Sequence, residues 1–293
     1  MFHEIGHPLG ILLAQGSLTR IAYTLGDYPT AKRILEDNLR LAELIGNRRL
    51  IIQIRANDLL YTYAHDHSKQ VAVLQQSFDF YKEQGDVGQV AWTLYEMGTI
   101  QLLDGHYEGA ERCYLQCFPM FQEIYDFQGI CWTSIWQATI ALARNELDKA
   151  EQLVNNGLQA IEGLTFPWGV SGAHYVLGDI ALARGNRDEA QRHFVEAVRI
   201  ANEVQSMIQI LRHLSGFAAW LISVGDLERA AALTIFLQEH PAIWVDTKKR
   251  TAQMLETLLP LLTSEQIERA RNKSKHFTIE TVMTEFLQNI PLR

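Results

Sequence analysis

The stretch HEIGH at residues 3–7 has the residue types and spacing of a zinc-hydrolase motif. On a continuous helix, two histidines four positions apart would present both imidazoles to one metal ion, and Glu4 would be the general base. Pro8 follows His7 directly and disfavours helical backbone at that residue. Leu13 stands where the longer form of the motif has a third histidine. We therefore expect no bound metal and no enzyme here, and keep zinc peptidase activity only as an alternative.

A second pair of metal-ligand types, Cys113 and Cys117, stands one helical turn apart. Both cysteines fall on the inward side of a predicted helix, where small apolar residues are needed, so we interpret them as packing residues. With Cys131 they make three cysteines in a long chain. An odd number argues against a disulfide framework and favours a reducing compartment, and the expected location is cytoplasmic. These residues imply no cofactor.

The elements that position these residues follow from a repeat. Short corners recur at intervals of 39 and then 40 residues, beginning at Gly26, His65, Gly105, Asn145, Gly185 and Gly225. Around most corners a small residue stands seven positions before the start and another five positions after it, as Gly178 and Ala190 do around Gly185. Two small residues that face each other across a turn let two helices cross closely, as in a tetratricopeptide-type hairpin. The pattern predicts an all-α, right-handed α-solenoid of six such hairpins.

The register of the repeat divides the chain into three expected segments. Residues 1–9 read as the remnant of a preceding repeat, residues 10–240 as the six hairpins, and residues 241–293 as C-terminal capping helices. Because the first segment starts inside a repeat, we expect the chain to be a fragment of a longer protein. The capping helices are expected because an array needs a polar end. Thr263 and Gln266 have the spacing of a capping box.

Composition restricts the classes of partner. The chain has 34 acidic and 26 basic residues, a net charge of −8, and no long run of lysine or arginine. A nucleic-acid surface would need such a run, so direct binding to nucleic acid is not expected. No apolar run approaches the roughly 20 residues that cross a bilayer, so no membrane insertion is expected.

The corner sequences Gly26-Asp27-Tyr28 and Gly225-Asp226-Leu227, at a period of 40 residues, resemble those of long tetratricopeptide arrays in MalT-like bacterial regulators. These regulators belong to the signal-transduction ATPases with numerous domains. The tail, residues 233–262 and 277–287, is similar to the C-terminal end of such proteins. The resemblance covers the whole chain and implies a sensor or partner-binding arm of a larger signalling or transcriptional regulator, without catalytic residues. Nothing in the chain resembles a P-loop.

In tetratricopeptide arrays the first helix of each hairpin lines the concave face, so the register predicts which side chains project there. The predicted groove residues are Arg20, Arg55, Trp92, Tyr95, Thr99, Trp132, Ile135, Thr139, Tyr175 and Asp179. Their aromatic members gather in hairpins three to five, and aromatic side chains are enriched at binding hot spots. The four aromatic residues are expected to be partly exposed. The alternative is that they only fill a tightly wound superhelix.

The resulting prediction is a non-enzymatic binding module. Its expected partner is a peptide, a protein segment or a small-molecule effector held in the concave groove. Self-association of the array into a homo-oligomeric scaffold is the alternative non-enzymatic function.

Overall fold

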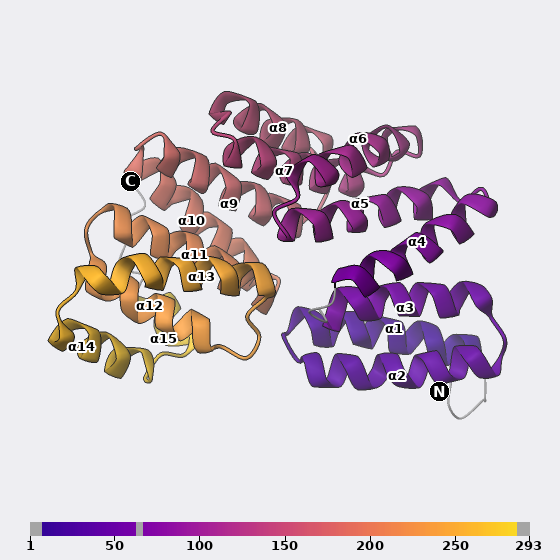
Figure 1. Cartoon of the computed structure of the whole chain (residues 1–293), viewed down its shortest axis with the longest axis horizontal. Coiled ribbons are helices and arrows are strands. Elements are labelled where there is room, and N and C mark those ends of the chain that lie inside the picture. The colour runs from indigo at the N-terminus through magenta and orange to yellow at the C-terminus, as the bar shows by residue number, and fades with distance from the viewer. Residues whose placement is uncertain (1–7, 63–66, 286–293) are drawn as a thin grey trace. The chain divides into compact units, whose positions relative to one another are not determined.

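A computed structural model describes residues 8–62 and 67–285, and the side chains of residues 8–57 and 70–285. These residues are almost entirely helical and contain no β-strand, which confirms the all-α prediction (Figure 1). The helices are α1 (Pro8–Thr24), α2 (Tyr28–Leu44), α3 (Arg48–Thr62), α4 (His67–Glu83), α5 (Val87–Leu103), α6 (Tyr107–Glu123), α7 (Phe127–Ala143), α8 (Leu147–Ala160), α9 (Pro167–Ala183), α10 (Arg187–Glu203), α11 (Met207–Ser223), α12 (Leu227–Glu239), α13 (Val245–Leu258), a short 3-10 turn (Leu259–Leu261), α14 (Ser264–Ser274) and α15 (Ile279–Met283). Six consecutive pairs, α1/α2 to α11/α12, correspond to the predicted hairpins.

The helices form two compact units. The first ends at Ile140 and contains α1 to α6 with most of α7, and the second begins at Ala141 and contains the end of α7 with α8 to α15. No helix in the described parts of the chain is both long enough and apolar enough to cross a membrane.

The predicted corners are left-handed turns of the backbone. Gly26, Gly105, Gly185 and Gly225 have φ values of 78°, 80°, 79° and 84°, and Asn145 has 61°. Glycine and asparagine tolerate this region, where other side chains are strained. At Gly185 the following amide of Asn186 donates to the carbonyl of Ala181 (2.8 Å), which closes the end of α9 as a Schellman motif. The predicted corner at His65 lies outside the described residues.

Close helix crossing is confirmed in the second unit. A Cβ atom on Gly178 of α9 would lie 2.6 Å from the ring of Phe194 of α10, and one on Gly216 of α11 would lie 2.3 Å from it. Such distances are shorter than atoms can approach, so the two glycines leave the space that Phe194 fills. Phe194 is fully buried between them.

The cysteine pair belongs to the core of the first unit. Cys117 is fully buried in a cluster with Tyr114 and Phe121, and Cys113 is 8% exposed. The Cys117 Sγ lies 3.8 Å from the hydroxyl of Thr133, and burial raises the pKa of the Cys117 thiol to about 12. The thiol therefore remains protonated at neutral pH, and the interpretation as a packing residue is confirmed.

The C-terminal helices follow α12 closely in space. α12 contacts both α13 and α14. The capping box at the start of α14 is confirmed: the Gln266 amide donates to the Thr263 hydroxyl (3.2 Å), and the Thr263 amide donates to the Gln266 side chain (2.9 Å).

Candidate binding groove

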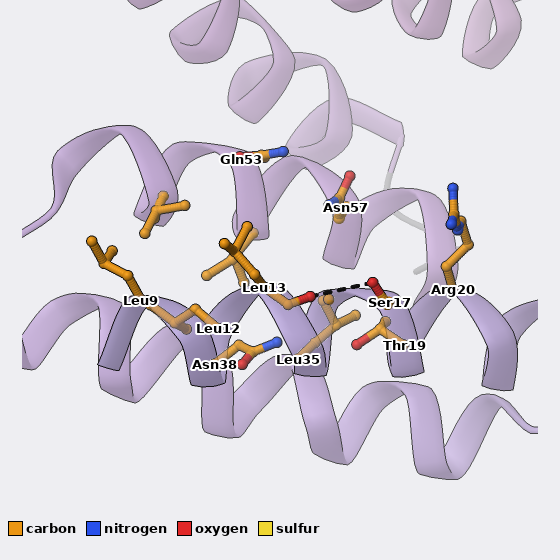
Figure 2. A pocket seen from close by; sticks show the side chains of 13 residues that line it. Leu9, Leu12, Leu13, Ser17, Thr19, Arg20, Leu35, Asn38, Gln53 and Asn57 are labelled. Atoms are coloured by element: carbon orange, nitrogen blue, oxygen red, sulfur yellow. Dashed lines mark hydrogen bonds between the residues drawn. The ribbon is translucent and has the colours of Figure 1, made fainter. Parts of the chain in front are cut away.

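A cavity of about 440 Å³ opens in the first unit, lined by α1, α2 and α3 (Figure 2). Helical spacing explains how α1 lines it, because Leu9, Leu13 and Arg20 recur at intervals that keep side chains on one face. One face of α3 lines the cavity in the same way, with Leu50, Gln53, Ile54 and Asn57. Helix α2 contributes Leu35 and Asn38. Leucines gather toward one end and Arg20 stands at the other (Figure 2). The groove is therefore apolar with one cationic end.

Asn38 is the unusual residue of this groove. Its side chain is 2% exposed, and its Oδ1 atom is buried without a hydrogen-bond partner in the described part of the chain. Figure 2 shows the carboxamide beside Leu12. A buried carbonyl oxygen without a hydrogen-bond partner costs about 1–3 kcal/mol, and buried polar groups are therefore nearly always paired. A ligand that hydrogen-bonds Asn38 would recover this free energy.

The other polar side chains of the groove are available too. The guanidinium of Arg20 is exposed and forms no ion pair with a described residue, and the amides of Gln53 and Asn57 form no hydrogen bond with one. Arg55 differs, since it pairs with Glu43 (3.1 Å) and does not line the cavity. Of the two predicted arginines, the structure places only Arg20 in the groove.

The predicted aromatic residues of α5 contact the core of the first unit. The indole Nε1 of Trp92 donates to Asp126 (2.9 Å), and its ring packs edge-on against Phe121 at 5.0 Å. The hydroxyl of Tyr95 accepts from the indole of Trp136 (2.7 Å). Both rings are partly exposed, as expected, but their polar atoms are already used. This favours the packing interpretation for Trp92 and Tyr95.

Three predicted groove residues have buried side chains, which corrects the expectation that they project into open space. Thr99, Ile135 and Tyr175 are 6%, 2% and 5% exposed. Thr99 lies 3.3 Å from the Tyr114 hydroxyl. Thr139, by contrast, is partly exposed, and its hydroxyl donates to the carbonyl of Ile135 (3.0 Å). Trp132 is also partly exposed.

A residue of the C-terminal helices contributes to the burial of Tyr175, whose ring also packs against Phe194 and His213. The guanidinium of Arg250, on α13, donates to both carboxylate oxygens of Asp179 (2.7 Å each) and to the Tyr175 hydroxyl. Sequence reasoning missed Arg250. The available signal was charge, since Asp179 is the one acidic residue of α9, and a basic run at 248–250 supplies its counter-charge.

Comparison with known proteins agrees with this architecture. Residues 171–196 match the family model of the tetratricopeptide repeat. The crystal structure of NprR in complex with its cognate peptide NprX superposes with a TM-score of 0.67 at 13% identity, covering 97% of this chain and 86% of NprR. The structure of BtubC (BKLC) from P. vanneervenii gives a TM-score of 0.51 at 14% identity, covering 75% and 93%. No curated protein sequence matches the chain.

At these identities the likeness concerns the fold, which is a tetratricopeptide-type helical array. In both solved structures, similarity extends well beyond the 26 residues of the matched repeat. The repeat match falls on α9 and α10, the pair with the Gly178 crossing.

One carboxyl group of the tetratricopeptide helices has an unusual proton affinity. Glu96, next to Tyr95 on α5, is partly buried, and this burial raises its pKa to about 8. No ion pair to a described residue offsets the burial. Glu96 is therefore largely protonated at neutral pH and can donate a hydrogen bond.

The HEIGH stretch at 3–7 lies outside the described residues, so its histidines have no structural account. Elsewhere, in residues 8–62 and 67–285, no three His, Cys, Asp or Glu side chains gather as metal ligands would.

Proposed function

We propose that the chain is a non-enzymatic binding module that holds a peptide or protein segment in the groove between α1 and α3. The proposal rests on two polar residues of this apolar groove. The Oδ1 atom of Asn38 is buried without a partner among the described residues, and Arg20 forms no ion pair with a described residue. The similarity to NprR, whose structure contains a peptide, supports this class of partner.

The chemistry of the groove matches the chemistry of a peptide segment. The leucine end can take an aliphatic side chain, whose burial contributes about 1.5–3 kcal/mol. The carboxamides of Asn38, Gln53 and Asn57 can each donate to and accept from peptide groups. Arg20 can form a two-pronged pair with a carboxylate. The preferred segment therefore carries an aliphatic side chain and an acidic group.

A setting within a larger regulator is part of the proposal. The corner sequences and the tail resemble those of MalT-like regulators, in which the array is the sensor arm. The groove would then bind the effector, and the cytoplasm would be its location.

A display selection tests the proposal. A library of random peptides is selected on the immobilised full chain, and the enriched peptides are measured on Arg20→Glu and Asn38→Leu variants. We expect enriched peptides to share an acidic residue and an aliphatic one, and to lose about tenfold or more in affinity on both variants. Arg33→Glu, an exposed arginine of α2 outside the cavity, is the matched control.

Two results would contradict the proposal. One is a selection that enriches no peptide, and the other is enriched peptides whose affinity is the same on Arg20→Glu as on Arg33→Glu. Sedimentation at several concentrations, run in parallel, measures self-association. A chain that only self-associates would support the scaffold alternative.

A further inference from the structure

Arg250 fills a site on α9 in the way that a bound ligand would. We propose that Tyr175 and Asp179 form a guanidinium-binding site that α13 occupies from within the chain, and that an arginine side chain of a partner competes for it. This site lies in the second unit and does not depend on the function proposed for the α1–α3 groove.

The geometry is specific for a guanidinium. Two nitrogens of Arg250 reach the two oxygens of Asp179 at 2.7 Å each, and the Arg250 Cζ stands 5.3 Å from the centre of the Tyr175 ring. A forked pair with one carboxylate and stacking on an aromatic ring are both features of arginine that an ammonium group does not reproduce. The site therefore selects arginine over lysine.

The neighbouring residues determine which cation pairs with Asp179. Asp179 is 16% exposed, so its carboxylate is largely desolvated and requires a cation. Arg212 lies over the same ring, 5.0 Å from its centre, and is 3.7 Å from Asp246. Arg212 therefore pairs with Asp246, and Asp179 is available to pair with Arg250 or with a competing arginine.

Few apolar side chains of α13 are fully buried. Its fully buried residues are Thr247, Thr251 and Leu258, while Val245, Met254 and Leu255 are partly buried. Thr251 uses its hydroxyl to donate to Gln238 (2.6 Å). Helix α12 differs, since it buries a row of apolar residues that includes Leu233 and Leu237. Because α13 has fewer fully buried apolar side chains than α12, the Arg250–Asp179 ion pair supplies a larger share of the contacts that hold it.

Helix α14 is attached to α12 by an ion pair that does not involve α13. Arg269 of α14 donates to both carboxylate oxygens of Glu228 on α12, at 2.9 and 2.8 Å. α14 contacts α12 directly. Release of α13 can therefore leave α14 in place, and the helix would move as a tethered segment.

The experiment removes the guanidinium of Arg250 and measures whether a small arginine derivative binds in its place. Acetyl-arginine amide and acetyl-lysine amide are titrated by calorimetry into the full-length wild type, Arg250→Gln and the double variant Arg250→Gln/Asp179→Asn. We expect the Arg250→Gln variant to bind the arginine probe roughly tenfold more tightly than the wild type does. The lysine probe should bind weakly to all three, and the double variant should lose the arginine probe.

Hydrogen exchange tests the release of α13. In Asp179→Asn we expect amides of residues 245–258 to exchange about tenfold faster, while those of α9 to α12 keep their wild-type rates. Arg184→Gln is the control, because it breaks a different ion pair next to α9: Arg184 directly follows the helix and pairs with Asp148 and Glu151 at the surface. The control should leave the exchange of α13 unchanged.

Several outcomes would overturn the proposal. A folded Arg250→Gln variant that does not prefer the arginine probe over the lysine probe would show that the site does not recognise a guanidinium. Loss of protection throughout α9 to α12, or failure of Arg250→Gln to fold, would show that α13 is a fixed part of the fold. Arg250→Lys keeps the charge without the fork, and exchange of α13 at the wild-type rate in that variant would also contradict it.

Discussion

Individual side chains in this chain depart from their usual behaviour mainly through burial. Burial raises the pKa of Glu96 and leaves the Oδ1 atom of Asn38 without a hydrogen-bond partner among the described residues. It also places the carboxylate of Asp179 against the guanidinium of Arg250. Their residue types were visible in the sequence, but their environments depend on helices distant along the chain. Arg250 and Asp179 are 71 positions apart, and no local pattern links them.

Glu96 provides a test by pH. Its folded-state pKa of about 8 lies above its ordinary value of 4.5. The protonated form therefore stabilises the fold at low pH, and this contribution is lost as the pH rises from 4.5 toward 8. Urea unfolding of Glu96→Gln should show a stability difference that grows in favour of the variant between pH 5 and pH 8.5. Glu123→Gln removes an exposed carboxyl of α6 and serves as control. If the free energy of unfolding depended on pH in the same way in both variants, the raised pKa of Glu96 would be contradicted.

The two tryptophans of α7 differ in burial, so their substitution distinguishes a core residue from a surface residue. Trp136 is 4% exposed, and its indole donates to Tyr95, whereas Trp132 is partly exposed. Removing a buried aromatic side chain costs about 3–5 kcal/mol. We expect Trp136→Ala to lose a free energy of unfolding in this range and Trp132→Ala to lose clearly less, measured by chemical denaturation. Equal losses would mean that Trp132 is also a core residue.

At the scale of the helices, sequence reasoning succeeded where a local rule applies. The 40-residue period and the glycine corners predicted the helix pairs, because a left-handed residue ends a helix wherever it occurs. It failed for Tyr175, Thr99 and Ile135, since the register alone does not show which neighbouring helix covers a side chain. Further helices after α12 were expected, but the contact of Arg250 on α13 with Asp179 on α9 was not.

The Gly178 crossing allows a direct test of helix packing. Alanine at this position would place a Cβ atom 2.6 Å from the Phe194 ring, so the ring or the helix must move. We expect Gly178→Ala to lose about 1–3 kcal/mol of stability through overpacking. Gly16→Ala in α1 is the contrasting case, because its Cβ would meet nothing within 4 Å, and a stability gain of about 0.5–1 kcal/mol is expected. A tolerated Gly178→Ala change would contradict the close crossing.

Over the whole molecule, the regularity of the hairpins varies. The second hairpin has polar residues, Asn57 and Gln70, at positions that are small or apolar elsewhere, and a small cluster of Ala56, Leu74 and Ile100. The α9/α10 pair buries Phe194, Val198 and several alanines. These residues lead us to expect looser packing in the second hairpin than in the fifth. Right-handedness of the complete array remains a prediction.

Native-state hydrogen exchange measures this difference. Local opening is easiest where few apolar side chains are buried. We expect amides in the middle of α3 and α4 to exchange faster than those in the middle of α9 and α10. Similar rates in both pairs would indicate that the polar residues of the second hairpin are well accommodated.

The junctions between successive hairpins also affect how much more stable this chain could become. Tyr125 and Gln205 adopt φ values of 55° and 52° at positions where other hairpin junctions have glycine. A left-handed conformation costs a non-glycine residue about 1–2 kcal/mol. Glycine at each position would remove that strain, less its own greater entropy in the unfolded chain. Because Tyr125 and Gln205 are in different units, the gains should add. Two substitutions outside the α1–α3 cavity could therefore raise the thermal stability of the chain.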